Sequence, residues 1–167
     1  SIEEIQKLFV FSHQNQINMT FRAGGTSLSG QGVTDGILVD LSNYWRKVQP
    51  ENNGLTVRVQ PGVIGAHVNI ALKKYGRKIG PDPASINAAM MGGILSNNSS
   101  GMCCGVVNNS YHTLKHLTFV MPDGLIFNTE KPEDYKRFEV EATETAGGIS
   151  YLRNEVLKNT ALVNRIR

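Results

Sequence analysis

The segment Arg22–Gln31 combines backbone freedom with side-chain hydroxyls. It reads Arg-Ala-Gly-Gly-Thr-Ser-Leu-Ser-Gly-Gln. Its glycines permit a concave backbone whose N–H groups converge, and its hydroxyls add donors, which is what a phosphate or diphosphate requires. When this segment is considered alone, the alternative is that it is a flexible surface loop. The segment therefore predicts an anion site formed largely by main-chain amides.

Two common phosphate-binding patterns do not fit this segment. Gly30-Gln31-Gly32 begins like the dinucleotide fingerprint G-x-G-x-x-G, but Asp35 stands at the sixth position. A strand is predicted to follow it, where the fingerprint requires a helix. The sequence also has no G-x-x-x-x-G-K-[ST] pattern. Neither a Rossmann-type nor a P-loop site is therefore expected.

Two further segments have the composition of binding loops. Pro81–Ser85 reads Pro-Asp-Pro-Ala-Ser, and its prolines fix the backbone, so the following amides and the Ser85 hydroxyl are presented rigidly. Gly92–Gly101 reads Gly-Gly-Ile-Leu-Ser-Asn-Asn-Ser-Ser-Gly. Small and amide side chains of this kind suit a flat ring with polar edge atoms. Individually, each also fits an ordinary turn or polar loop.

Together the three segments resemble the FAD-binding domain of the p-cresol methylhydroxylase and vanillyl-alcohol oxidase superfamily. Within it, the chain is most similar to the FAD-dependent D-2-hydroxyacid dehydrogenases, which include the D-lactate, glycolate and D-2-hydroxyglutarate enzymes. The resemblance covers roughly Met19 to Asn128. It implies that Arg22–Gln31 binds the FAD pyrophosphate, that Pro81–Ser85 lies by the flavin, and that Gly92–Gly101 lines the isoalloxazine and ribityl region. It also implies an α+β fold, with two α+β subdomains and the cofactor between them.

The residues that the resemblance assigns to the cofactor are Arg22, Ala23, Gly24, Gly25, Thr26, Ser27, Leu28, Ser29, Gly30, Gln31, Pro81, Asp82, Pro83, Ala84, Ser85, Gly92, Gly93, Ser96, Asn97, Ser99 and Gly101.

Two departures from the family pattern affect the cofactors. Some relatives carry a histidine, bonded covalently to the flavin, where this chain has Thr26. Threonine cannot form that bond, so we expect non-covalent FAD. The family has a tyrosine-glycine pair soon after the third segment, whereas this chain continues Met102-Cys103-Cys104. The cysteine pair is similar to the pattern of a subgroup whose long polypeptides add an iron–sulfur segment downstream. An iron–sulfur cluster is therefore expected only in a full-length protein and not in this chain.

The resemblance implies oxidation of a D-2-hydroxyacid to a 2-oxoacid by hydride transfer to flavin N5. The reduced flavin would then pass its electrons to an electron acceptor. It places the base and the carboxylate-binding cations in a cap domain beyond Arg167, so no catalytic residue is assigned. The chain begins at Ser1 and stops within an expected helix, which suggests a piece of a longer protein. The alternatives are another flavoenzyme of the superfamily, such as a cell-wall precursor reductase or the FAD subunit of a molybdenum hydroxylase, and a non-redox module that binds a nucleotide anion.

Histidine and cysteine spacing does not predict a metal site. His112 and His116 are four residues apart, but the segment is interpreted as the start of a strand, where such positions lie ~13 Å apart. Cys103 and Cys104 are adjacent, which suits neither a structural disulfide nor a C-x-x-C site. These free thiols and the lack of a signal peptide favour a reducing, cytoplasmic location.

The spacing of apolar residues predicts the elements that carry the three segments. Ser1 and Glu4 form a capping box before a helix whose apolar face includes Ile5 and Leu8. Strands are expected at Met19–Arg22 and, as a nearly continuous apolar and therefore buried run, at Gly36–Leu41.

Further along, Leu55–Gln60 alternates as a strand does, and Pro61-Gly62 leads into a helix closed by Gly76. Strands at Leu114–Met121 and Leu125–Asn128 are joined by the turn Pro122-Asp123-Gly124, and a charged helical region with a break at Gly147-Gly148 follows.

We expect subdomains at 1–45 and 46–130 and a helical extension at 131–167. Few helices separate the strands, which favours α+β over a doubly wound sheet.

Composition limits the partners. The net charge is +3, and the only local cluster of cations is Lys73, Lys74, Arg77 and Lys78. No long basic run alternates with aromatic residues, so nucleic-acid binding is not expected. No apolar run reaches the ~20 residues of a membrane span.

Overall fold

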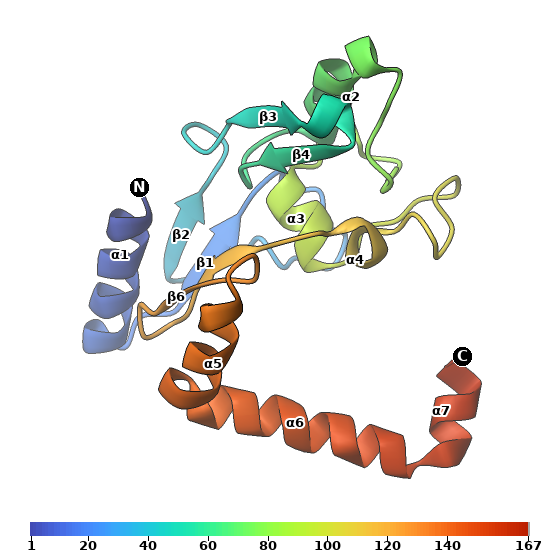
Figure 1. Ribbon diagram of the computed structural model, residues 1–167. Helices are drawn as coiled ribbons and strands as arrows, with labels where there is room; N and C mark the ends of the chain where they lie inside the picture. The colour runs from blue at the N-terminus through green and yellow to red at the C-terminus, as the bar shows by residue number, and fades with distance from the viewer. Residues whose placement is uncertain (167) are drawn as a thin grey trace. The chain divides into compact units, whose positions relative to one another are not determined.

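The computed structural model describes residues 1–166 and has the expected α+β composition (Figure 1). The elements in chain order are α1 (Ile2–Asn15), β1 (Met19–Arg22), β2 (Ile37–Asp40), β3 (Val48–Glu51), η1 (Asn52–Gly54), β4 (Thr56–Val59), α2 (Gly65–Leu72), η2 (Lys73–Tyr75), α3 (Met91–Ser96), α4 (Ser110–Thr113), β5 (Thr118–Val120), β6 (Ile126–Asn128), α5 (Pro132–Glu141), α6 (Thr143–Lys158) and α7 (Thr160–Ile166).

Residue contacts divide the chain into two compact units. One comprises Ser1–Gln6 with His116–Arg167, and the other is Lys7–Lys115. All three candidate segments belong to the second unit. The subdomain boundaries expected from the sequence remain a prediction.

Strands β1 and β2 pair in parallel, with Met19 opposite Ile37 and Arg22 opposite Asp40. Parallel neighbours need a long crossover connection, which is usually a helix. Here the crossover is the irregular stretch 23–36, so the first candidate segment is the crossover itself. Strand β2 is not fully buried as expected, because its side chains alternate between half-buried and exposed.

The second sheet is the antiparallel hairpin β3–β4, with Val48 opposite Val59. Strand β3 was not predicted from the sequence. Pro50 lies within it, and proline is tolerated in a strand only at a sheet edge or bulge. The predicted helix after Pro61-Gly62 is confirmed as α2, which continues into η2 and ends at Gly76 with φ +68°. Its face packs into the core of this unit, whose buried members are Val63, Val68, Leu72, Ala89, Met91 and Ile94.

Helix α3 contains the glycines that the sequence placed in a loop. Gly92 and Gly93 lie in its first turn, and the Gly92 amide donates to the Pro61 carbonyl at 2.9 Å. A Cβ on Gly92 would stand 2.7 Å from Pro61 Cβ, whereas a Cβ on Gly93 would meet only Ala23 Cβ at 4.0 Å. A side chain at position 92 would therefore prevent α3 from approaching the end of β4.

In the first unit, the hairpin β5–β6 packs against α5 through aromatic rings. Phe127 is almost fully buried, and its ring centroid lies 5.7 Å from that of Phe119 and 5.2 Å from that of Phe138. The turn at Pro122-Asp123-Gly124 is confirmed, with Gly124 N donating to Met121 O at 2.8 Å.

Two sequence expectations in this region are wrong. Strand β5 begins at Thr118 and not at Leu114, because Asn109 caps the short helix α4 ahead of it and the main chain of 114–117 is irregular. Helix α6 runs through Gly147-Gly148 without a break, and the helices separate instead at Ala142 and Asn159. Glycine lowers helix stability by only about 1 kcal/mol, which neighbouring turns can offset.

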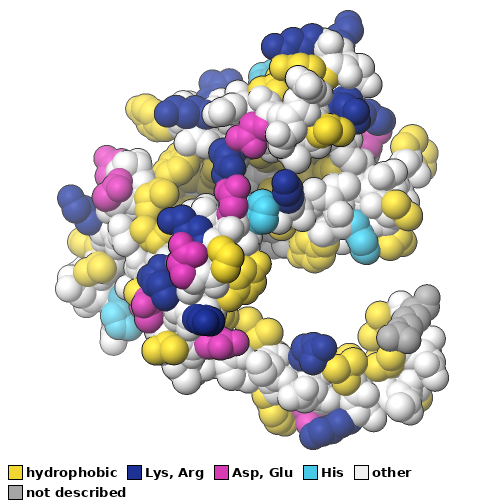
Figure 2. All heavy atoms as spheres, in the orientation of Figure 1, with side chains coloured by type: hydrophobic (Ala, Val, Ile, Leu, Met, Phe, Trp, Pro, Cys, Tyr) yellow, Lys and Arg dark blue, Asp and Glu magenta, His cyan; other side chains and the backbone are white. Residues whose placement is uncertain are grey.

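The cluster of cations lies where α2 and η2 end. Lys73 and Lys74 are in the last turn, where the helix dipole favours positive charge, and the dark blue side chains gather there in Figure 2. Lys78 pairs with Asp82 at 3.4 Å. Among residues 1–166, no helix is both long and apolar enough to cross a membrane.

We expect Gly92→Ala to lower the free energy of unfolding by about 1–3 kcal/mol, because its Cβ would overlap Pro61. Gly93→Ala is the matched control in the same helical turn and should change stability by no more than ~1 kcal/mol, in the stabilising direction. Urea unfolding of the FAD-free protein, followed by the fluorescence of Trp45, measures both. Equal effects of the two variants would contradict the packing of α3 against Pro61.

Candidate functional site

The crossover loop leaves its main-chain donors free. Among the described residues, no backbone amide from Ala23 to Gly32 donates a hydrogen bond within the chain. Gly25 and Gly30 have φ of +61° and +73°, which favour glycine. Residues 25–31 are exposed, so the amides of this part of the loop are open to a ligand. The loop therefore offers the main-chain donors that an anion requires.

The start of the loop is held by a charged pair at the end of the β1–β2 ladder. Arg22 Nη2 lies 3.2 Å from Asp40 Oδ2, and Ser42 N donates to Asp40 Oδ1 at 2.8 Å. Hydrogen bonds from Ser42, followed by those from Arg22, lower the pKa of Asp40 to about 2. Asp40 is therefore ionised at neutral pH and keeps the Arg22 side chain beside the ladder.

The glycines of the loop have two different surroundings. A Cβ on Gly24 would stand 2.5 Å from the Ala88 carbonyl oxygen, so Gly24 packs against main chain. A Cβ on Gly30 would meet no atom within 4 Å and would project into open space. On Gly25 it would meet only the Arg22 side chain, at 3.3 Å. Gly24 thus fixes the loop to the fold, while Gly30 faces outward.

The side chains of the loop are directed to solvent or to one another. Ser27 Oγ donates to Gln31 Oε1 at 2.5 Å. Leu28 is fully exposed, and Thr26 and Ser29 are also exposed. The hydroxyls of Thr26 and Ser29 are accordingly accessible from outside the chain.

The second segment, Pro81–Ser85, is partly buried. Contrary to expectation, the amides of Ile86, Ala88 and Ala89 that follow it bond within the chain and are not presented to a ligand. Pro81 and Pro83 are buried, Asp82 is half-buried, and Ala84 is exposed. The carbonyl of Ser85 accepts from Ala88 N at 2.8 Å and from Ala89 N at 2.7 Å, which folds the chain into consecutive turns.

The third segment, Gly92–Gly101, is half helix and half turn. Ser96 Oγ donates to the Gly92 carbonyl at 2.7 Å, and Ser99 Oγ donates to Asn97 Oδ1 at 2.5 Å. Gly101 has φ +112°, and a Cβ there would overlap the Asp82 carbonyl. Position 101 therefore has to be glycine for the second and third segments to pack together.

The structure brings the three segments together within one unit. The first approaches the third where Gly93 faces Ala23, and it approaches the turn after the second where Gly24 meets Ala88. The second and third pair through Asp82 N, which donates to Ser100 O at 2.7 Å. The three segments thus adjoin one another, although up to 79 positions separate their ends in the sequence.

Sequence reasoning missed the helix that supports the third segment. In α4, Ser110 is fully buried and Tyr111 contacts the third segment through both its amide and its hydroxyl. The signal was Asn109, whose side chain caps α4 by accepting from His112 N at 2.9 Å. This also corrects the interpretation of His112, which lies in a helix and not in a strand.

The cysteines and histidines are dispersed in the described part of the chain. Cys103 is exposed, and Cys104 is a buried thiol whose Sγ lies 3.2 Å from the Gly105 carbonyl oxygen. Between residues 1 and 166, no three His, Cys, Asp or Glu side chains are grouped as a metal site requires.

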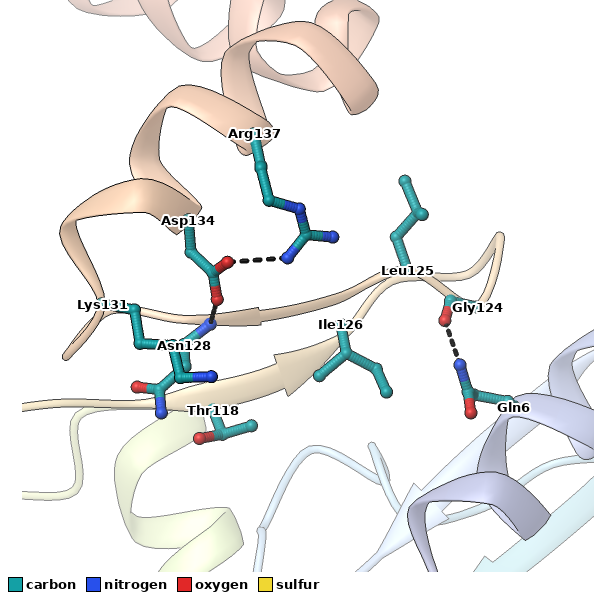
Figure 3. A pocket seen from close by; sticks show the side chains of 9 residues that line it. All are labelled: Gln6, Thr118, Gly124, Leu125, Ile126, Asn128, Lys131, Asp134 and Arg137. Atoms are coloured by element: carbon teal, nitrogen blue, oxygen red, sulfur yellow. Dashed lines mark hydrogen bonds and ion pairs between the residues drawn. The ribbon is translucent and has the colours of Figure 1, made fainter.

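A hollow of about 470 Å³ lies in the other unit, away from the predicted residues (Figure 3). Asp134 is buried there, accepting from Asn128 N at 2.8 Å and pairing with Arg137 at 2.7 Å. The amide of Asn128, with Arg137, lowers the pKa of Asp134. Arg137 also pairs with Glu141, so these charged side chains are all paired with one another. The hydrogen bond from Asn128 N to Asp134 connects β6 to α5.

Curated proteins of known name are similar to this chain in sequence. The D-2-hydroxyglutarate dehydrogenase of Pseudomonas putida is 39% identical over 87 residues, which are 52% of this chain and 9% of that protein. The mitochondrial D-lactate dehydrogenase (cytochrome) 1 of Saccharomyces cerevisiae is 31% identical over 134 residues, which are 77% of this chain and 22% of that protein. The chain thus spans less than a quarter of the length of these relatives.

Solved structures show the same fold. The 6-hydroxy-D-nicotine oxidase of Arthrobacter nicotinovorans superposes with a TM-score of 0.68 at 19% identity, over 77% of this chain and 28% of that chain. The glucooligosaccharide oxidase of Acremonium strictum, which has a 6-S-cysteinyl, 8α-N1-histidyl FAD, superposes with a TM-score of 0.65 at 21% identity, over 77% of this chain and 27% of that chain.

The family described as the FAD binding domain matches residues 1–130, which include all three segments. The resemblance inferred from the sequence is confirmed, and the chain belongs to the FAD-binding domain family.

Proposed function

We propose that this chain is the FAD-binding part of a dehydrogenase that oxidises a D-2-hydroxyacid to a 2-oxoacid. The observation that supports it most directly is the crossover loop, whose amides from Ala23 to Gly32 have no partner among the described residues. Such amides suit a diphosphate. The dehydrogenase names of the relatives support the substrate class.

In this proposal each of the three segments holds a different part of FAD. Arg22–Gln31 would hold the pyrophosphate, because its donors are exposed and Gly30 leaves space outside the backbone. Pro81–Ser85 and Gly92–Gly101 would support the flavin and the ribityl chain, because they pair with each other and adjoin the loop. Thr26 is exposed but has no nucleophilic nitrogen, so the binding is proposed to be non-covalent.

When bound, FAD would supply the hydride acceptor, flavin N5. The chain's own residues bind and orient the cofactor. The base for the substrate hydroxyl and the cations for its carboxylate are assigned to other parts of the whole protein, as is any iron–sulfur cluster. An electron acceptor completes the cycle. The cytoplasmic location stays a prediction that is compatible with two free thiols.

Gly30→Ala should weaken FAD binding by the whole protein about tenfold or more, because the new Cβ projects to the side where the pyrophosphate would lie. Gly76→Ala is the matched control, since Gly76 has φ +68° and equally open surroundings outside the three segments. Both variants should carry the same strain of about 1–2 kcal/mol. Titration of the FAD-free protein, followed by flavin fluorescence, compares them. Equal affinities would place the pyrophosphate elsewhere.

The whole protein should be yellow as purified, and it should oxidise D-lactate or D-2-hydroxyglutarate with an artificial electron acceptor. Reduction of a dye acceptor measures the activity, with the L-enantiomers as the control. A flavoprotein that turns over neither D-acid would favour another flavoenzyme of the superfamily. A protein that takes up no FAD would favour the non-redox anion-binding module.

Acid precipitation of the purified flavoprotein should release all of its FAD into the supernatant, because Thr26 cannot form the histidyl bond. Absorbance of the supernatant and the pellet measures the partition. Flavin that stays in the pellet would show a covalent bond through another residue, and peptide mapping would then test exposed Cys103 first.

A further inference from the structure

The cluster of cations at the end of α2 and η2 extends beyond the end of the helix. Its members, all exposed, are Lys73, Lys74, Arg77 and Lys78. Lys73 and Lys74 lie in the last turn, where the helix dipole favours positive charge. Arg77 and Lys78 follow Gly76, after the helix has ended. The dipole therefore accounts for only part of the cluster.

The turn at Gly76 brings Arg77 back to the end of the helix. Gly76 has φ +68°, and its amide donates to the Lys73 carbonyl at 2.9 Å. The Arg77 amide donates to the Leu72 carbonyl at 3.4 Å, so the chain reverses immediately after the helix. As a result, cations from both sides of the turn line one hollow. This hollow has a volume of about 300 Å³ and is lined by Asn69, Ile70, Lys73, Gly76 and Arg77.

The cations of the hollow have no carboxylate partner in the described part of the chain. Lys73, Lys74 and Arg77 form no ion pair there, whereas Lys78 pairs with Asp82 at 3.4 Å. The Lys74 ammonium lies over the ring of the neighbouring Tyr75, 5.0 Å from its centroid. Positive charge that the chain itself does not neutralise is available to a negatively charged partner.

The cluster adjoins the second segment, Pro81–Ser85. Its last member, Lys78, forms the ion pair with Asp82 of that segment. Asn69, which lines the hollow, also holds the connecting chain, because its Oδ1 accepts from Ile79 N at 2.9 Å. A partner that binds in the hollow would therefore lie near the segment that is proposed to lie by the flavin.

A protein surface fits this site better than a lipid surface does. Helix α2 buries Val68 and Leu72 in the core, so it has no continuous apolar face to insert into a membrane. Ile70 is 68% exposed and lies between the cations of the hollow. An apolar contact surrounded by charge is the arrangement of a protein interface, and a hollow accepts a projecting carboxylate side chain.

We infer that this hollow and its cluster of cations dock an acidic electron-transfer protein that reoxidises the flavin. The inference rests on the proposed function, because it takes the second segment to lie by the flavin. The reduced flavin gives up two electrons, one to each of two carrier molecules, and the accompanying protons pass to solvent. Opposite charges mainly raise the rate of association, which suits a carrier that has to leave after each transfer.

Cytochrome c and its succinylated form are suitable probes, because they share one haem and differ in charge. Succinylation replaces the lysine cations of cytochrome c by carboxylates. The whole protein, oxidising whichever D-hydroxyacid it turns over, should reduce the succinylated form, and kcat/KM should fall steeply as salt is added. Haem absorbance measures the reduction. A wild-type protein that reduces a dye but not succinylated cytochrome c would overturn the inference.

The double variant Lys73→Glu/Arg77→Glu tests the site directly. At low ionic strength it should lower kcat/KM for succinylated cytochrome c about tenfold or more, because the hollow then repels carboxylates. For native cytochrome c the change should have the opposite sign. Flavin content and the rate with a small uncharged dye should stay at wild-type values, since neither residue belongs to the three segments. An unchanged kcat/KM for the succinylated form would overturn the inference.

Lys7→Glu/Arg153→Glu is the matched control. It replaces one exposed lysine and one exposed arginine outside the cluster, with the same change in net charge. It should alter kcat/KM for succinylated cytochrome c by about twofold at most, because separated surface charges are screened. An equal loss in the two double variants would show an effect of net charge alone and would overturn the assignment of the site.

Sedimentation with vesicles tests a lipid surface as the occupant. Lys73→Glu/Arg77→Glu should not change the fraction of the whole protein that sediments with vesicles of phosphatidylserine and phosphatidylcholine. Sedimentation that this variant abolishes would assign the cluster to an anionic lipid surface and would overturn the inference.

The wild-type protein separates the two levels of failure. If it takes up no FAD, the proposed function is wrong and the inference falls with it. If it takes up FAD and oxidises the D-hydroxyacid with a dye, but Lys73→Glu/Arg77→Glu reduces both cytochromes as the wild type does, only the inference is wrong.

Discussion

The parallel pairing of β1 with β2 is the constraint on which the candidate site depends. Parallel strands cannot be joined by a tight turn, so the chain must return along the sheet before it pairs again. Most proteins use a helix for this return, and a helix would satisfy its own amides. Here the return is the glycine-containing stretch 23–36, and its first amides have no partner among the described residues. The pairing thus creates a long loop that is fixed at both ends and rich in free donors.

The three segments are held by close approaches that only glycine allows. Gly24 lies against the Ala88 carbonyl, Gly92 against Pro61, and Gly101 against the Asp82 carbonyl. Each contact joins segments that are distant in the sequence. Gly30, in contrast, has open space around it and a positive φ. One type of residue therefore has two roles here: some glycines let the chain pack on itself, and others leave room for a ligand.

The packing behind the loops explains how irregular chain can form a precise surface. The carbonyls of the turns after Ser85 accept hydrogen bonds from the start of α2: Gly65 N donates to Ala89 O at 2.9 Å, and Ala66 N donates to Ile86 O at 3.0 Å. Val68 and Ile94 are buried beneath these turns. Since binding groups held by a packed core lose less freedom on binding, this unit is suited to a large, extended cofactor.

The sequence by itself determined the chemistry of the three segments and the α+β class. Runs such as Leu55–Gln60 and the glycine, serine and asparagine motifs carry their signals locally, through side-chain alternation and φ preference. Only the tertiary structure decided the rest. Strand β3 tolerates Pro50 because it pairs with β4 alone, and α6 passes through Gly147-Gly148 because neighbouring turns continue the helix. Whether a glycine faces Ala88 or open space depends on residues far away in the chain, and no local pattern records those contacts.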